Sequence, residues 1–176
     1  MSSMDDVCGL PSGGSVRIAA RAAAPEGAPD DLPPRVVATE PAVELLRELV
    51  GRHGPVMFHQ SGGCCDGSAP MCYPDGEFRV GQRDVLVGEL DLGDDDEARA
   101  PGASVGLRVR VWISGSQFET WKHTQLVVDA VPGRGSGFSL ENPTGKRFLS
   151  RARTFDEREL AALEEFPPPT GADLDV

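Results

Sequence analysis

The sequence predicts a mainly β (α+β) fold, and three observations support that prediction. Glycine and proline are frequent, with 21 Gly and 15 Pro among 176 residues, which favours tight turns over long helices. Short apolar runs alternate with turn residues along most of the chain. Clear helical spacing of apolar residues is confined to 41–50. We therefore expect compact, twisted β-sheets or a barrel with an N-terminal amphipathic helix and a short C-terminal helix.

The two ends of the chain are predicted to be disordered tails around one domain. Residues 1–35 are rich in Gly, Ala, Ser, Pro and Asp and contain almost no large apolar residues. Such a segment buries too little surface to offset the entropy lost on ordering. Cys8 lies in this tail, and we assign it no role. The single domain is expected at 36–166, followed by a polar tail at 167–176.

The first element of the expected domain is the helix at 41–50. Thr39 can cap it, and Pro41 is tolerated in its first turn. Apolar residues then recur at the spacing of one helical face, and Gly54-Pro55 ends the pattern. This is the strongest helical signal in the chain.

The strands are expected to follow the helix in short runs. They are predicted at 55–59, 77–80, 85–90, 107–113 and 124–131, with a hairpin of 137–140 and 147–149 around the turn 142–145. The stretch 107–113 alternates between apolar residues and arginine, as a half-buried strand does. A capping box at Thr154 and Glu157 then predicts a short helix that ends near Glu165.

The charge of the chain excludes several classes of partner. The net charge is −11, so binding to a nucleic acid or to an anionic membrane is not expected. No stretch approaches the roughly 20 apolar residues that span a bilayer, and the N-terminus lacks a signal-peptide pattern. We expect a cytoplasmic protein whose four cysteines are reduced.

Chemistry is predicted at a cluster of cysteines in a glycine-rich loop. Cys64, Cys65 and Cys72 lie within the run HQSGGCCDGSAPMC (59–72). Several thiolates on one loop suit an iron–sulfur cluster or a single Fe, Zn or Cu ion. His59, just before the loop, and His123, in a polar cluster beside a tryptophan, are further candidate ligands. Either histidine could also act as a base for a thiol nucleophile, and the cysteines could also be purely structural.

Three longer segments carry a resemblance to a bacterial family. The loop 59–72, the stretch 111–131 and the stretch 133–151 together resemble domain of unknown function 779, over roughly 38–165. Members of that family are often encoded beside aldehyde dehydrogenases. The resemblance therefore implies an accessory role in aldehyde or alcohol metabolism, with an aldehyde dehydrogenase as a partner.

The order of the elements also resembles the HesB-like A-type iron–sulfur carriers. The shared features are the helix 41–50, the strand 55–59, the Gly-Gly-Cys loop 62–64, the Gly-Ser-Gly-Phe segment 135–138 and Asn-Pro at 142–143. This resemblance implies a HesB-like fold and an iron–sulfur function. Those carriers end in a Cys-Gly-Cys motif that this chain lacks, so only Cys64 matches by position.

Three functions follow from these patterns. The first is a non-enzymatic metal or iron–sulfur binding accessory protein, with Cys64, Cys65, Cys72, His59 and His123 as the ligands. The second is a thiol enzyme or redox protein with a cysteine nucleophile. The third is an interaction module that stabilises an aldehyde dehydrogenase. A second copy of the chain is a further candidate partner, in a homodimer.

Overall fold

A computed structural model of the chain describes residues 17–61, 70–93, 107–135 and 138–176. Eight strands form a single sheet in the order β4-β3-β6-β5-β1-β2-β7-β8. The strands are β1 (Ile18–Ala22), β2 (Val36–Thr39), β3 (Val56–Gln60), β4 (Met71–Pro74), β5 (Val85–Asp91), β6 (Arg108–Ile113), β7 (Thr124–Pro132) and β8 (Lys146–Thr154). The helices are α1 (Glu40–His53), α2 (Gly115–Trp121) and α3 (Glu157–Glu164), with a 3-10 turn η1 (Asn142–Thr144). The mainly β prediction is confirmed.

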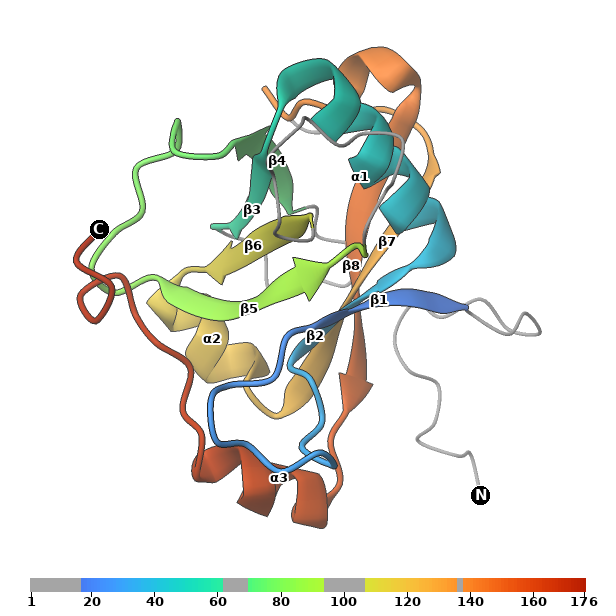
Figure 1. Ribbon diagram of the computed structural model, residues 1–176. Helices are drawn as coiled ribbons and strands as arrows, with labels where there is room; N and C mark the ends of the chain where they lie inside the picture. Colours follow the sequence, from blue (N-terminus) through green and yellow to red (C-terminus); the bar gives the residue numbers. More distant parts are fainter. Residues whose placement is uncertain (1–16, 62–69, 94–106, 136–137) are drawn as a thin grey trace.

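The sheet curls into a half-barrel around α1 (Figure 1). The curl brings the β4 side of the sheet close to the segment that precedes β8. There the Leu140 backbone N–H donates to the Cys72 carbonyl at 3.0 Å. The Cys72 N–H in turn donates to Ser139 Oγ at 2.9 Å. On the inner face, Ser150 Oγ of β8 lies 2.6 Å from Gln60 Oε1 of β3. These polar contacts join the two sides of the curled sheet.

Helix α1 begins and ends where its sequence indicates. Thr39 Oγ1 accepts a hydrogen bond from the Ala42 N–H, and Pro41 lies in the first turn. Gly54 follows the helix with φ 78°, a conformation that side chains disfavour. The helix covers the predicted 41–50 and continues to His53, but it is not the first element of the fold, because β1 and β2 precede it.

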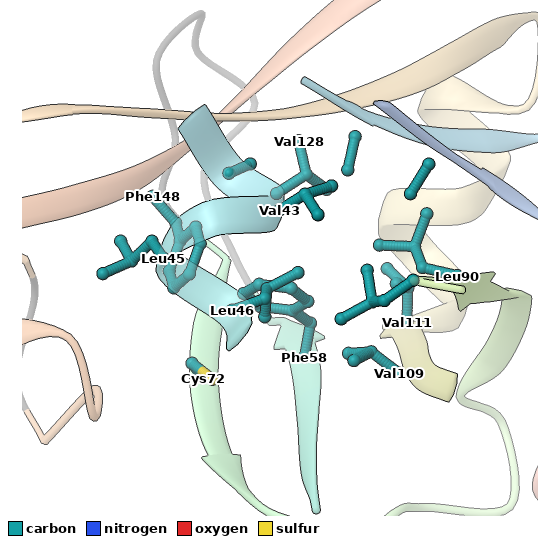
Figure 2. Close-up of a cluster of buried hydrophobic side chains, with 14 of the residues drawn as sticks. Val43, Leu45, Leu46, Phe58, Cys72, Leu90, Val109, Val111, Val128 and Phe148 are labelled. Atoms are coloured by element: carbon teal, nitrogen blue, oxygen red, sulfur yellow. The ribbon is translucent and has the colours of Figure 1, made fainter. Parts of the chain in front are cut away.

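The core lies between α1 and the inner face of the sheet. Figure 2 shows that α1 inserts its apolar side chains among residues from strands far apart in the sequence. Phe58 of β3 meets Phe148 of β8 edge to face, with ring centroids 4.8 Å apart. The buried members include Val43, Leu45, Leu46, Phe58, Cys72, Leu90, Val109, Val111, Val128 and Phe148.

Residues 17–35, expected to belong to a disordered tail, contain a strand in the middle of the sheet. Strand β1 pairs antiparallel with β2 on one side and with the end of β5 on the other. Its Ala20 is only 4% exposed. Two neighbouring strands order β1 through backbone hydrogen bonds, and these bonds do not require large apolar side chains. The composition of the segment therefore did not reveal the strand. Residues 1–16, including Cys8, lie outside the described residues.

Two strand predictions are corrected. Residues 77–80 leave a turn and continue as a loop, and the strand lies earlier, at β4, which pairs antiparallel with β3. The predicted hairpin partner of 147–149 is corrected, because the described residues 138–140 form no strand and β8 pairs with β7 over nine residue pairs from Thr124↔Thr154 to Pro132↔Lys146. The turn predicted at 142–145 contains η1, and it leads directly into β8.

Two features of the helices also differ from the predictions. Helix α2, capped by Ser114, was not predicted, because it is short and buries none of its residues. The cap of α3 is Asp156, and its capping box is completed by Glu159 in place of the predicted Thr154 and Glu157. Within the described residues no helix has the length and apolarity that crossing a bilayer requires.

Candidate functional site

The best-formed polar site in the described residues is a pair of the buried His59 and the partly buried Asp84. His59 is at the end of β3, where strand alternation turns Phe58 into the core and His59 to the opposite face. Its Nε2 lies 2.9 Å from Asp84 Oδ2, and the histidine is 3% exposed. Asp84 comes directly before β5, and its Oδ2 also accepts a hydrogen bond from the Gly81 N–H at 2.8 Å. The Gly81 backbone therefore helps to fix the position of the Asp84 carboxylate.

The second ring nitrogen of His59 faces Ser61. Nδ1 lies 2.6 Å from Ser61 Oγ, and Ser61 is exposed. A carboxylate can only accept, so Nε2 carries the proton that points to Asp84. In the neutral ring, Nδ1 is therefore the acceptor and the Ser61 hydroxyl donates to it. Asp84 fixes the tautomer, and the lone pair of Nδ1 points toward the start of the cysteine-containing loop.

An aromatic stack covers the outer side of the His59 ring. The Phe78 ring lies 4.2 Å from the imidazole at an angle of 34°, and Tyr73 stacks on Phe78 at 4.8 Å. Both aromatic residues pack against a small apolar cluster of Met57, Leu86 and Trp112 on the same face of the sheet. This packing excludes water from most of the ring and holds its orientation.

Cys72 lies on the opposite face from His59. The β3–β4 register pairs Phe58 with Cys72 and His59 with Met71, so Cys72 shares the core face of Phe58. Cys72 is fully buried. Burial raises the pKa of its thiol well above the ordinary range, and the charge of Glu141 raises it further. The thiol is therefore disposed to stay protonated at neutral pH, as in a cysteine packed into an apolar core.

His123, the remaining predicted site residue within the described ranges, lies apart from His59. His123 is exposed in the turn after α2, where its carbonyl accepts a hydrogen bond from the Phe155 N–H at 3.0 Å. No contact in the described residues brings it to His59. Cys64 and Cys65 lie outside the described residues. Among the predicted ligands that the structure describes, only His59 has both ring nitrogens in hydrogen-bond contact with polar side chains.

The comparison with known families agrees with the resemblance. A family model described as Domain of unknown function (DUF779) matches residues 45–154. The chain belongs to the DUF779 family. No curated protein and no solved structure matches the chain, so the HesB-like fold stays a prediction. The matched range contains His59, Asp84 and the cysteines of the loop, so the site lies within the DUF779 domain.

The residues of this DUF779 protein fit part of a metal site. Within the described ranges, no three His, Cys, Asp or Glu side chains are grouped closely enough to hold an ion. A histidine that donates its other N–H to a carboxylate is, however, the usual arrangement behind a metal ligand. His59 and Asp84 have this arrangement. Cys64 and Cys65, the further ligands predicted from the sequence, lie outside the described residues.

Asp84 is the site residue that sequence reasoning missed. It lies 25 residues after His59, and no motif or spacing links the two. The pair forms because the turn before β5 folds back over the outer face of β3. No periodicity in the sequence reports that contact.

A second buried polar cluster of the DUF779 domain lies beside Cys72. Glu141 is fully buried, and one of its oxygens accepts a hydrogen bond from Ser139 Oγ. The other oxygen, Oε1, has no hydrogen-bond partner in the described residues. Burial raises the pKa of Glu141, although hydrogen bonds from the Ser139 side chain and from the Glu141 and Phe148 backbone oppose the shift. An ionised carboxylate is therefore costly at this position.

Replacing Glu141 with Gln is expected to stabilise the fold at pH 8 by about 1 kcal/mol, because the amide cannot ionise. A raised pKa in the folded state makes wild-type stability fall as the pH rises from the ordinary pKa of 4.5 through the folded value. The Glu141→Gln variant lacks this fall, so its advantage grows over that range and vanishes in acid. Urea denaturation between pH 4 and 8 measures it, with the exposed Glu165→Gln as the control. Parallel pH profiles for wild type and Glu141→Gln would contradict the prediction.

Proposed function

We propose that this chain is a metal or iron–sulfur binding accessory protein of aldehyde or alcohol dehydrogenase metabolism. In this proposal His59 Nδ1 and the thiolates of Cys64 and Cys65 hold the metal, and Asp84 orients His59. Cys72 and His123 are left out of the ligand set, because the first lies in the core and the second has no contact with His59. The observation that supports the proposal is the hydrogen-bonded pair of buried His59 and partly buried Asp84, with Nδ1 directed toward Ser61 at the start of the cysteine loop.

The geometry around Nδ1 supports a ligand role. A ligating imidazole must present a lone pair, and in the neutral ring the Asp84 contact directs that lone pair to Nδ1. The partner of Nδ1 is Ser61, whose own side chain is exposed. Cys64 follows Ser61 by three residues, a length of chain that spans at most about 10 Å. A thiolate within that reach can approach Nδ1.

The donor set restricts the metal. Thiolate and imidazole together suit zinc, copper(I) or an iron–sulfur species and disfavour magnesium or calcium. Two thiolates and one imidazole leave a fourth tetrahedral position open. An open position suits a protein that passes its metal or cluster to a client, because the client's ligand can enter there.

The test is the metal content of protein purified without oxygen, measured by elemental analysis and visible absorption. We expect stoichiometric metal in the wild type and its loss in His59→Ala, Cys64→Ser and Cys65→Ser. Asp84→Asn keeps the first ligands and should weaken affinity about 10–100-fold. Cys72→Ala is the matched control and should keep its metal. Metal-free wild type that takes up none on reconstitution, or full metal in the His59 and both loop-cysteine variants, would sink the proposal.

The same geometry favours a second candidate, a nucleophile activated by His59. Ser61, His59 and Asp84 are hydrogen-bonded in the order nucleophile, base and orienting carboxylate. In this function Nδ1 removes the proton from the Ser61 hydroxyl or from a loop thiol, and the resulting anion attacks an electrophile such as an aldehyde. Ser61→Ala separates the two candidates. Metal affinity should be kept or rise, because Nδ1 loses a competitor, whereas nucleophilic labelling at Ser61 should disappear.

The client assignment rests on the family resemblance. Co-expression of the chain with an aldehyde dehydrogenase tests it through the metal content and activity of the dehydrogenase. A gain that requires Cys64 and Cys65 supports metal delivery. A gain that survives their replacement favours the pure interaction module instead.

A further inference from the structure

The C-terminal segment (167–176), expected to be disordered, is bound along the start of β5. The Leu86 N–H donates to the Pro169 carbonyl, and the Gly171 N–H donates to the Asp84 carbonyl, both at 2.9 Å. The Ala172 N–H also donates to the Gln82 carbonyl at 3.1 Å, and Val85 and Thr170 form an antiparallel bridge. In Figure 1 the segment, in red, runs from α3 up to the region of β5.

The segment binds there because the first half of β5 has one free edge. Strand β1 pairs with β5 only at Leu90 and Asp91, and an Ala23–Glu89 backbone hydrogen bond continues that edge. From Val85 to Val87, the edge facing away from β6 lacks β1. Unpaired backbone groups at such an edge attract an extended chain. The C-terminal segment supplies it.

The contact is close at Gly171, which is buried against the turn that holds Asp84. A Cβ atom on Gly171 would lie 2.1 Å from the Gly81 carbonyl oxygen, so no side chain fits there. Gly81 is also the residue whose N–H donates to Asp84 Oδ2. The Gly81–Asp84 turn is therefore held on one side by the C-terminal segment and on the other by His59.

We propose that the C-terminal segment positions Asp84 and, through it, the ring of His59, with Gly171 as the positioning residue. The family match ends at residue 154, so this element lies outside the matched DUF779 range. The proposal goes beyond the proposed function, because it concerns the tautomer and orientation of His59 and holds whether the ring binds a metal or serves as a base.

The test is the imidazole spectrum of His59 in the metal-free full-length chain. Ring nitrogen NMR, assigned with His59→Ala, should show the Nε2–H tautomer and a slowly exchanging Nε2 proton in the wild type. In Gly171→Ala the side chain displaces the Gly81–Asp84 turn, so we expect mixed tautomers and proton exchange at least about tenfold faster, the effect of losing roughly 1.4 kcal/mol of protection. Gly51→Ala is the matched control, because an added Cβ there meets nothing within 4 Å.

A second variant keeps the test decisive if Gly171→Ala fails to fold. Asp173 Oδ2 accepts hydrogen bonds from the Thr170 N–H and hydroxyl at 2.8 and 2.9 Å, and Asp173→Ala removes both without adding bulk. It should accelerate Nε2 proton exchange with no loss of circular dichroism. An unchanged His59 spectrum in every folded variant would overturn the positioning role. A changed His59 spectrum in the variants, together with a wild type that never binds metal, would leave the positioning role standing and would reject the metal function alone.

Discussion

Replacing Phe58 with Ala is expected to lower the free energy of unfolding by about 3–5 kcal/mol. Phe58 is fully buried between α1 and the inner face of the sheet, and it meets Phe148 of β8 at 4.8 Å. The substitution removes the favourable free energy of burying the ring. It also leaves a cavity between β3 and β8, the two sides of the half-barrel. Urea denaturation followed by circular dichroism measures the loss.

Phe138→Ala is the matched control for this prediction. Phe138 is 93% exposed, so the same chemical change should alter the stability by no more than about 0.5 kcal/mol. Equal losses for Phe58→Ala and Phe138→Ala would show that the core is not built around Phe58.

The Asp129→Ala substitution is expected to destabilise the fold by about 3–5 kcal/mol, because it leaves the half-buried Arg151 guanidinium without its counter-ion. Asp129 of β7 lies 2.8 Å from Arg151 Nε and accepts a hydrogen bond from Thr39 Oγ1 at 2.6 Å. Thr39 is the N-cap of α1, so this carboxylate also connects the sheet to the start of the helix. Thermal unfolding and urea denaturation at pH 7 measure the effect.

The pH dependence gives a second measurement of the same interaction. Burial alone would raise the pKa of Asp129, but the hydrogen bonds from Thr39, Arg151 and the Ala130 N–H outweigh it and lower the pKa. A lowered pKa means that the contribution is complete above the ordinary pKa of 3.8 and is lost as the pH falls through the folded value. The wild type and Asp129→Ala should therefore converge in acid. The exposed Glu119–Lys122 pair, also at 2.8 Å, is the control, and Glu119→Ala should leave stability nearly unchanged at every pH.

The elements predicted correctly are those whose side chains repeat with a clear period. Helix α1 buries the apolar face that its spacing indicates, and β6 buries Val109 and Val111 while Arg108 and Arg110 stay exposed. The period of a helix or strand is a local property, so the sequence reports it directly. Strands β5 and β7 were also predicted correctly, because a short continuous run of apolar residues is likewise a local signal.

The elements missed are those stabilised by backbone pairing. Strand β1 and the C-terminal segment have small or polar residues and looked like tails, yet their N–H and C=O groups bond to neighbouring strands. Strand β4 was missed for a related reason: its residues Met71–Pro74 show no alternation of apolar and polar side chains, and it is ordered by pairing with β3. A pairing between distant segments leaves no local pattern, because each segment is ordered only by its partner.

For the candidate site, the sequence by itself determined the chemical groups, and the tertiary structure decided which of them meet. His59 and the cysteines of the loop are recognisable from their types and their glycine-rich setting. Which face Cys72 occupies follows from the β3–β4 register, because neighbouring residues of a strand point to opposite faces. That register places Cys72 in the core and His59 on the outer face, where the turn before β5 supplies Asp84. Strand register and the position of a distant turn depend on contacts across the whole sheet, so no local pattern reports them. The register separated Cys72 from His59, and the turn added Asp84, which no motif had indicated.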